Sequence, residues 1–377
     1  MLVLLLLIMS TKKRVVIIGC GYAGRSTAMQ LDEDFDVTVV DPRDKLVHKI
    51  LLRSAVRPEW VNCMLIPNDK IMKNGKQIVA SVKQLDTRNK QVVLTSGAVL
   101  NYDYCVIASG AQSKAPVEPP TGQAPREYFN QVAGTIAEAK NILVVGGGPV
   151  GIELAGEIKD KHTNTKVTLV SSTSCLCHNM KFPPNVSQQI VDTLKSVGVE
   201  TVLSHPIDLG AHGKESLIVH HPPKDYSDKL RHIDLVINCT GSVPNTLFVP
   251  HEFLNNMGQV KVNNQLQVSH TVFAIGDCTD LKEAKNFVNV AGAAYMPGFP
   301  RGHSDVVADN IKAMESGKPL GDYTPNSYVA GIIPCGPNAS VTLGFPDEYG
   351  MYKRGSFFYE GQFAFAKAGN PPPMPSL

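Results

Sequence analysis

Two glycine-rich turns of equal spacing constrain this chain more than any other feature of its sequence. The first comprises Gly19, Cys20, Gly21, Tyr22, Ala23 and Gly24, and the second has Gly146, Gly148 and Gly151 in the three glycine positions. In such turns the first glycine allows a tight bend, the second lets a phosphate approach the backbone, and the third lets a helix pack on a strand. One turn alone is weak evidence, but two predict a pair of dinucleotide sites.

The first turn has the surroundings of a strand–helix–strand unit. It follows an apolar run at 14–18 and precedes a helix predicted over 23–31. The next apolar run, 37–40, ends on Asp41. A carboxylate at this strand end binds the hydroxyls of a ribose.

The second turn repeats this arrangement with a different ending. It follows the apolar run 141–145, and a helical segment then leads to a strand predicted over 167–170. That strand ends on Ser171 and Ser172, so the acid is missing. An acid there would repel a 2'-phosphate, and its absence predicts that NADH and NADPH are both used, with a slight preference for NADPH.

Composition narrows the class of protein. The chain has 377 residues, 43% of them hydrophobic, and a net charge of +2 without a long basic run, so no nucleic-acid surface is expected. Eight scattered cysteines in a chain of this size predict free thiols in a reducing, cytoplasmic compartment. The apolar run 2–9 is too short to span a bilayer, which leaves two interpretations: a membrane tether, or an extension before a start at Met9.

Two further segments have similar sequence patterns. Residues 102–110 and 233–241 both read as buried strands that end in small-residue turns, so the chain resembles a duplication. A later strand, 271–275, runs into Gly276 and Asp277. The predicted fold class is α/β, with two Rossmann-like domains and a small C-terminal α+β region.

The predicted domains follow from this order of motifs. They are an FAD-binding domain in two parts, 12–115 and 246–304, an inserted NAD(P)H-binding domain at 116–245, and a C-terminal region at 305–377.

The order of motifs resembles the two-dinucleotide flavoproteins with a glutathione-reductase-like fold, over about residues 13–345. Within that family the chain is most similar to the apoptosis-inducing-factor-like quinone reductases, and the segment 44–53 carries much of this resemblance. The resemblance implies FAD as a bound cofactor, NADH or NADPH as the reductant, and a quinone as the acceptor.

The resemblance also implies roles at the first site. The pyrophosphate of FAD would lie on 19–23, Asp41 would bind the adenosine ribose, and Asp277 the ribityl chain. The backbone of Val82 would meet the adenine edge, while its side chain belongs to the core. Arg53 would brace the flavin. The alternatives are a surface ion pair for Arg53 and a helix N-cap for Asp277.

At the second site, the resemblance implies that the turn from Gly146 to Gly151 cradles the nicotinamide dinucleotide and that Glu153 lies near the nicotinamide. Glu157 follows one helical turn later on the same face. The alternative for either carboxylate is an exposed ion pair with Lys161.

The acceptor is less constrained than the cofactors. A disulfide acceptor would need a redox cysteine pair with the spacing Cys-x4-Cys or Cys-x2-Cys, and neither occurs. Cys175, Cys177 and His178 form either a labile thiol pair, a metal site or a loop without a special role, and no metal is predicted. Other acceptors remain open: a monodehydroascorbate-type substrate or an electron carrier, or no acceptor at all in a flavoprotein that acts through redox-dependent partner binding.

The C-terminal region suggests peripheral contact with a membrane or a lipid-droplet surface, because aromatic residues are dense at 355–366, although packing against the domain is the alternative. Pro297 and Pro300 should bend or delay a helix beside the flavin. Oligomeric state is not predictable from these patterns.

Overall fold

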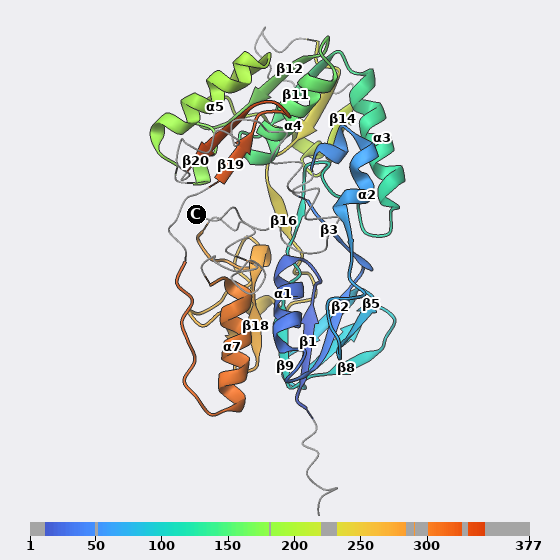
Figure 1. Ribbon diagram of the computed structural model, residues 1–377, viewed down its shortest axis with the longest axis vertical. Helices are drawn as coiled ribbons and strands as arrows, with labels where there is room; N and C mark the ends of the chain where they lie inside the picture. The colour runs from blue at the N-terminus through green and yellow to red at the C-terminus, as the bar shows by residue number, and fades with distance from the viewer. Residues whose placement is uncertain are drawn as a thin grey trace, which may run out of the picture. The chain divides into compact units, whose positions relative to one another are not determined.

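A computed structural model describes the chain over residues 12–49, 52–180, 182–219, 232–283, 290, 301–325 and 331–343. Its contacts divide the chain into two compact units (Figure 1). The first consists of Met1–Leu46, Pro67–Ala111 and Pro244–Asn326, and the second of Val47–Ile66, Gln112–Val243 and Ser327–Leu377. Within the described residues, no helix has both the length and the apolar character needed to cross a membrane.

The first unit is built on a six-stranded sheet with the order β17-β18-β9-β1-β2-β5. Only β17 runs antiparallel to its neighbour, while the other pairs are parallel. Its strands are β1 (Arg14–Ile18), β2 (Asp36–Asp41), β5 (Lys76–Val79), β9 (Tyr104–Ile107), β17 (Gln267–Ser269) and β18 (Val272–Ala274). The central strands β1, β9 and β18 are apolar and buried because both faces of the sheet are covered there.

Strand β1 shows how the two faces are covered. Alternation sends Val15 and Ile17 into a core with helices α1 (Tyr22–Leu31) and α7 (His303–Glu315), which pack against each other (Figure 1). Val16 and Ile18 point into a second core on the opposite face. That core includes residues of a three-stranded antiparallel sheet, which consists of β6 (Val82–Asp86), β7 (Gln91–Leu94) and β8 (Val99–Asn101).

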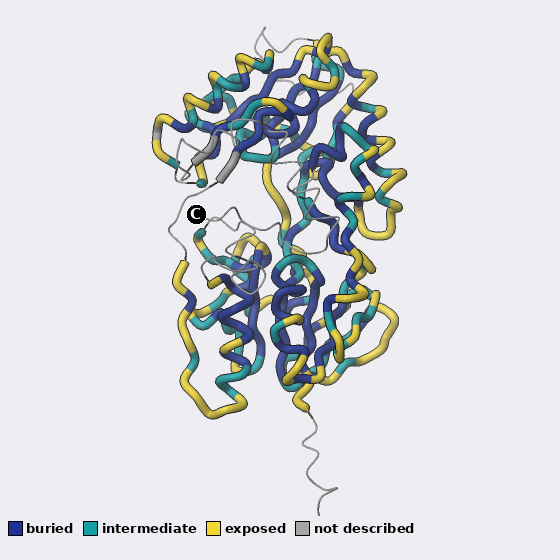
Figure 2. Tube along the Cα trace, in the orientation of Figure 1, coloured by how far each residue is buried: buried dark blue, intermediate teal, exposed yellow. Residues whose placement is uncertain are grey.

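The second unit repeats the parallel design in a five-stranded sheet, β13-β12-β11-β15-β14. Its strands are β11 (Asn141–Val145), β12 (Lys166–Val170), β13 (Val199–Val202), β14 (Leu217–Val219) and β15 (Leu235–Asn238), and only β14 is antiparallel. Helices α3 (Pro125–Glu138), α4 (Pro149–Lys161) and α5 (Pro184–Ser196) each begin with a proline, whose fixed φ suits the first helical position. The central strands of both sheets are buried (Figure 2).

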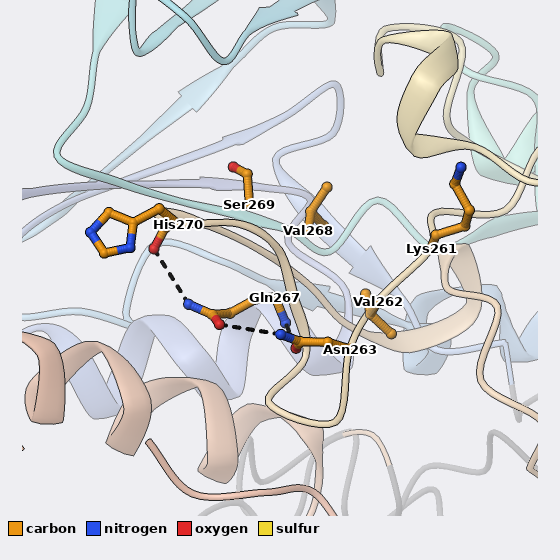
Figure 3. Close-up of a pocket in the computed structure, with 7 residues that line it drawn as sticks. All are labelled: Lys261, Val262, Asn263, Gln267, Val268, Ser269 and His270. Atoms are coloured by element: carbon orange, nitrogen blue, oxygen red, sulfur yellow. Dashed lines mark hydrogen bonds between the residues drawn. The ribbon is translucent and has the colours of Figure 1, made fainter. Parts of the chain in front are cut away.

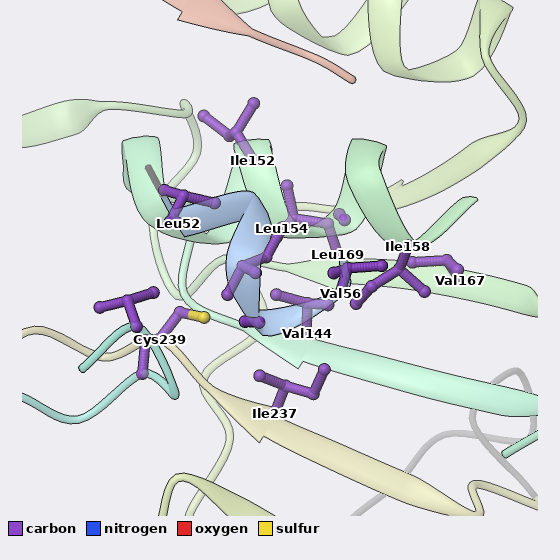
Figure 4. Packing of buried hydrophobic residues seen from close by; sticks show 14 of the residues in the cluster. Leu52, Val56, Val144, Ile152, Leu154, Ile158, Val167, Leu169, Ile237 and Cys239 are labelled. Carbon is purple, nitrogen blue, oxygen red and sulfur yellow. The ribbon is translucent and has the colours of Figure 1, made fainter. Parts of the chain in front are cut away.

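Two further segments pack on α4. The first contains the short helices η1 (Leu52–Ala55), η2 (Pro58–Trp60) and α2 (Val61–Met64), and it places Leu52 and Val56 in the core with Leu154 and Ile158 (Figure 4). The second is the antiparallel hairpin of β19 (Gly331–Pro334) and β20 (Ser340–Leu343). A Cβ placed on Gly156 would lie 2.2 Å from the carbonyl carbon of Cys335, so only glycine allows this approach.

Short elements complete the described chain. Two-stranded sheets pair β3 (Lys45–Val47) with β4 (Leu65–Pro67), and β10 (Ala111–Ser113) with β16 (Ser242–Pro244). The remaining helical turns are η3 (His178–Met180), η4 (Gly210–His212), η6 (His251–Phe253) and η7 (Gly276–Cys278).

The contact-defined units and the predicted cofactor domains divide the chain differently. Residues 47–66 lie with the second unit, and the predicted boundary at 304–305 falls in the first turn of α7. The assignment of each part to a cofactor stays a proposal. The apolar run 2–9, Pro297, Pro300 and the aromatic tail 355–366 lie outside the described residues.

Candidate functional site

The first glycine turn has the geometry that its spacing predicts. Gly19 follows β1 with φ of +106°, and a Cβ placed on it would lie 2.3 Å from the carbonyl oxygen of Ala108. A Cβ on Gly24 would lie 2.0 Å from the carbonyl oxygen of Gly19. Gly21 has nothing within 4 Å of its Cβ position. The outer glycines therefore close the turn, and the middle one borders open space where a phosphate fits.

The start of α1 is suited to an anion. Gly21 is the N-cap of α1, and no side chain caps the helix. The first backbone N–H groups of a helix have no partner within it, and they carry the positive end of the helix dipole. Open space, uncapped N–H groups and the glycine bend together fit the pyrophosphate of FAD. Tyr22 and Ala23 form the first two residues of the helix.

Asp41 ends β2 beside this turn. Its Oδ2 accepts a hydrogen bond from the backbone N–H of Cys20 at 2.7 Å, and its Oδ1 accepts one from the N–H of Arg43 at 2.8 Å. The carboxylate therefore fixes the turn and stays partly exposed. Its position is the one at which a carboxylate binds a ribose.

Asp277 lies at the same edge of the sheet. It is exposed and follows β18, which pairs in parallel with β9, and β9 in turn pairs with β1. A Cβ placed on the preceding residue, Gly276, would lie 3.7 Å from the Cβ of Ala23. The Gly276–Asp277 turn therefore adjoins the first glycine turn. Asp277 belongs to the short helical turn η7.

The second glycine turn has nearly the same backbone geometry as the first. Gly146 has φ of +126°, and a Cβ on it would lie 2.4 Å from the carbonyl oxygen of Cys239. A Cβ on Gly151 would lie 2.1 Å from the oxygen of Gly146, while Gly148 again borders open space. Gly148 is the N-cap of α4, also without a side-chain cap. These residues fit a second dinucleotide by the same physical test.

The strand end at the second turn differs from that at the first. Ser171 directly follows β12, in the place that corresponds to Asp41 at the end of β2, and its Oγ lies 3.0 Å from the Oγ1 of Thr173. The same Oγ would lie 2.6 Å from a Cβ on Gly147. Ser172 is exposed. A hydroxyl group therefore replaces the carboxylate beside the second turn.

Helix α4 buries two carboxylates one turn apart. The side chain of Glu157 is 0% exposed, and its Oε2 lies 3.2 Å from Nε of Arg57 and 3.5 Å from Nη2 of Arg53. Glu153 is also buried, and burial, with the charge of Glu157 as a second cause, raises its pKa well above its ordinary value. Glu153 therefore favours the protonated form.

The alternatives considered for Glu157 and Arg53, exposed ion pairs at the surface, do not describe the observed contacts. Lys161 donates from Nζ to the carbonyl oxygen of Val56 at 2.6 Å, and Glu157 pairs instead with two arginines far away in the sequence. Arg53 makes a buried ion pair rather than a surface one, and its guanidinium lies 4.3 Å from the ring centroid of Trp60. Arg57 is a site residue that was not predicted, because nothing in the sequence links it to Glu157.

Val82 is the first residue of β6 and is half-buried against the core of the first unit. Its role at the adenine edge is a proposal that follows from the resemblance. The same holds for the flavin role of Arg53.

The cysteines do not form a redox pair. None of the eight forms a disulfide, and burial raises the pKa of Cys177, Cys239 and Cys335 to about 12, which keeps these thiols protonated. The half-buried Cys175 has its Sγ 3.3 Å from Nδ1 of His178. Among the residues that the structure describes, no three His, Cys, Asp or Glu side chains are grouped to hold a metal ion.

A pocket of about 450 Å³ lies on the turn before β17 (Figure 3). It is lined by Lys261, Val262, Asn263, Gln267, Val268, Ser269 and His270. Its amides bond to one another, since Asn263 Nδ2 donates to Gln267 Oε1 at 3.3 Å and Gln267 Nε2 donates to the oxygen of His270 at 3.4 Å. The pocket includes no residue of either glycine turn.

A model of the pyridine nucleotide-disulphide oxidoreductase family matches residues 13–298. The chain belongs to this family. The match confirms the predicted α/β fold class and, at the level of the family, FAD and a nicotinamide dinucleotide as cofactors.

Several named proteins are similar over most of the chain. Apoptosis-inducing factor homolog B of Dictyostelium discoideum is 35% identical, with 90% of this chain and 89% of that protein covered. Human ferroptosis suppressor protein 1 is 28% identical, with 87% of each chain covered. The recognised resemblance to apoptosis-inducing-factor-like proteins is thereby confirmed.

Solved structures share the fold. The sulfide:quinone oxidoreductase of Aquifex aeolicus superposes with a TM-score of 0.67 at 16% identity, covering 96% of this chain and 93% of the other. NDH2 of Plasmodium falciparum, solved with NADH, has a TM-score of 0.64 at 14% identity, covering 96% and 99%.

Proposed function

We propose that this chain is an FAD-dependent NAD(P)H:quinone oxidoreductase. The observation that carries the proposal is the presence of two glycine turns with the same open middle glycine, one followed by a strand that ends on Asp41 and the other by a strand that ends on Ser171. The first suits a permanently held FAD, and the second suits a nicotinamide dinucleotide that exchanges.

Residues of the first unit would hold FAD. Backbone N–H groups at Gly21 and Tyr22 bind the pyrophosphate, Asp41 binds the adenosine ribose, Asp277 the ribityl chain, and the backbone of Val82 the adenine edge. When bound, FAD supplies hydride acceptance from the nicotinamide and electron delivery to the acceptor. In this assignment 12–115 and 246–304 form the FAD domain.

Residues of the second unit would hold the nicotinamide dinucleotide in the inserted domain, 116–245. Gly146, Gly148 and Gly151 form its cradle, and Glu153, buried at the start of α4, contacts the nicotinamide end. Because burial raises the pKa of Glu153, its carboxyl group can donate a hydrogen bond to the nicotinamide when protonated. Arg53, which pairs with Glu157, would brace the flavin, as the resemblance implies.

Two observations support a quinone as the acceptor. The free and mostly buried cysteines offer no redox pair for a disulfide substrate. The named relatives include ferroptosis suppressor protein 1, and a fold neighbour is a sulfide:quinone oxidoreductase. We place the enzyme in the cytoplasm, with peripheral contact to a membrane or lipid droplet where its quinone resides.

The test is to purify the chain with its bound flavin, reduce the flavin anaerobically with NADH or NADPH, and follow reoxidation by a panel of quinones. We expect rapid bleaching and fast quinone-dependent recovery. A reduced flavin that persists with every quinone but reoxidises with an electron carrier or with monodehydroascorbate contradicts the quinone assignment. Persistence with all acceptors favours the partner-binding alternative, which the apoptosis-inducing factor relative suggests.

A further inference from the structure

A buried network of three side chains surrounds the turn that contains Asp277. His303 is the first residue of α7, and its side chain is 0% exposed. Its Nδ1 accepts a hydrogen bond from the backbone N–H of Gly276 at 3.1 Å, and its Nε2 bonds to Oε1 of Glu283. The second oxygen of Glu283 accepts a hydrogen bond from the hydroxyl of Tyr323 at 2.8 Å.

These contacts fix the state of the imidazole. Because Gly276 donates to Nδ1, that nitrogen is unprotonated, and the ring proton resides on Nε2, where it is donated to Glu283. The ring of Tyr323 packs edge-on against His303 with the centroids 4.6 Å apart. The carboxylate therefore orients the imidazole, and the imidazole in turn holds one backbone amide.

That amide is the first one beyond the sheet. The last ladder bond of this strand runs from the N–H of Ile275 to the oxygen of Ile107. Gly276 then turns away with φ of +76°, so its N–H would be a buried donor without a strand partner. His303 satisfies it and thereby sets the direction in which the chain leaves toward Asp277.

The same network ties the turn to the first glycine turn. Ser304, next to His303, bonds through Oγ to Oγ of Ser26 on α1 at 2.9 Å, and both are buried. Gly276 itself adjoins Ala23 at the start of that helix. Thus α7, the Gly276–Asp277 turn and the start of α1 are held together by polar contacts of defined geometry.

We propose that His303 is a positioning residue for FAD. Glu283 and Tyr323 orient the His303 side chain, which holds the Gly276 amide so that Asp277 faces the ribityl chain. The inference rests on the proposed function, since it assumes that FAD binds at the first glycine turn. It assigns a role to three residues that carry no recognisable sequence motif.

The test compares three substitutions in the purified chain, measuring the Kd for FAD by reconstitution of the flavin-free protein. Asn in place of His303 keeps an acceptor near Nδ1 for Gly276, whereas Gln keeps a donor near Nε2 for Glu283, and Leu keeps neither. We expect His303→Asn to bind FAD within about threefold of wild type, and His303→Gln and His303→Leu to bind it at least about tenfold more weakly, as loss of one buried hydrogen bond predicts.

Asn310→Ala is the matched control, because it removes buried hydrogen bonds to the carbonyl oxygens of Gln265 and Gly321 farther along α7 and should lower Tm without changing the Kd for FAD. Equal affinities for the Asn and Gln variants, or a Kd that follows Tm across all four variants, would overturn the positioning role. A wild-type chain that binds no FAD would instead contradict the proposed function, so the two failures are distinguishable.

Discussion

The two glycine turns of this chain have one backbone design and two chemical settings. In both, the outer glycines meet backbone oxygens at 2.0–2.4 Å from a hypothetical Cβ, and the middle glycine faces open space. Beside the first turn, the carboxylate of Asp41 binds a backbone N–H, whereas beside the second the hydroxyl of Ser171 binds Thr173. The glycines of both turns leave room for a dinucleotide, and the two strand ends give the turns different chemical settings.

The helices that follow the turns bury different ionisable groups. Helix α1 buries Arg25, which donates to the carbonyl oxygen of Pro67 and to Oδ1 of Asn68. Helix α4 buries Glu153 and Glu157. The guanidinium of Arg25 favours a tightly held pyrophosphate at the first turn, whereas on α4 the charge of Glu157 is compensated by Arg53 and Arg57, and Glu153 favours its neutral form. This difference supports a resident cofactor at the first turn and an exchanging one at the second.

The largest expected effect comes from filling the open space at one turn at a time. Gly21→Val and Gly148→Val add a side chain where the structure has no neighbour within 4 Å, so each should fold normally. Gly21→Val should lose bound FAD. Gly148→Val should keep FAD and raise KM for NADPH by about 100-fold or more, because the phosphates can no longer approach the backbone.

The measurement is the flavin content of each purified variant, followed by steady-state kinetics. If Gly148→Val also loses FAD, or Gly21→Val keeps it, the assignment of cofactors to the two turns is wrong.

The two carboxylates of α4 should respond oppositely to neutralisation. Glu157→Gln leaves Arg53 and Arg57 without the anion that they share, and should lower the free energy of unfolding by about 2–4 kcal/mol. Glu153→Gln removes a carboxylate whose raised pKa makes its ionised form unfavourable in the folded state. That penalty is absent below the ordinary pKa and grows as pH rises, so this variant should be more stable than wild type at pH 7.

Urea unfolding at pH 7 measures the change in the free energy of unfolding for both variants. Glu200→Gln, at an exposed ion pair with Lys166, serves as the control. A loss of stability in Glu153→Gln would show that favourable contacts hold this carboxylate and outweigh the penalty of its burial.

An acidic residue at the end of β12 should give the second glycine turn the same neighbouring carboxylate that the first turn has. Ser171→Asp should lower kcat/KM for NADPH by about tenfold, through repulsion of the 2'-phosphate, and leave NADH nearly unchanged. Ser171→Asn tests size without charge. The wild-type chain should use both nicotinamides, and a wild-type preference for NADH beyond about 100-fold would contradict this specificity.

The smallest effect concerns acid sensitivity in the second unit. His48 is buried, and burial lowers its pKa from 6.5 to about 4. Between these values the unfolded chain binds a proton that the folded chain does not, so stability is present above pH 6.5 and falls as pH drops toward 4. His48→Gln should flatten this slope. Equal slopes for wild type and variant, in unfolding experiments at pH 7.5 and 5, would exclude His48 as the cause.

Local patterns in the sequence were sufficient to predict the glycine turns, their strands and helices and the contrast between Asp41 and Ser171. Each depends on residues close together in the chain, where glycine spacing and apolar periodicity act directly. The predicted helix over 23–31 differs from the observed α1 by one residue at its start.

Contacts between distant segments were not predictable in this way. Arg53 and Arg57 reach Glu157 only because residues 47–66 pack on α4, and His303 reaches Gly276 only because α7 packs on α1. Neither pairing has a periodicity or motif, since each depends on the tertiary fold rather than on local propensity. The alternative interpretation of Glu157, an exposed ion pair with Lys161, is wrong for this reason.

The most direct test of two different cofactor sites is the anaerobic reaction of NADPH with the Gly148→Val variant, compared with the wild-type chain. The wild-type chain should carry about one FAD, which NADPH bleaches. The variant should carry the same FAD, bleached by dithionite but hardly at all by one equivalent of NADPH. Bleaching of the variant at the wild-type rate, or a wild-type chain that holds no flavin, would contradict the assignment of the two turns to two different cofactors.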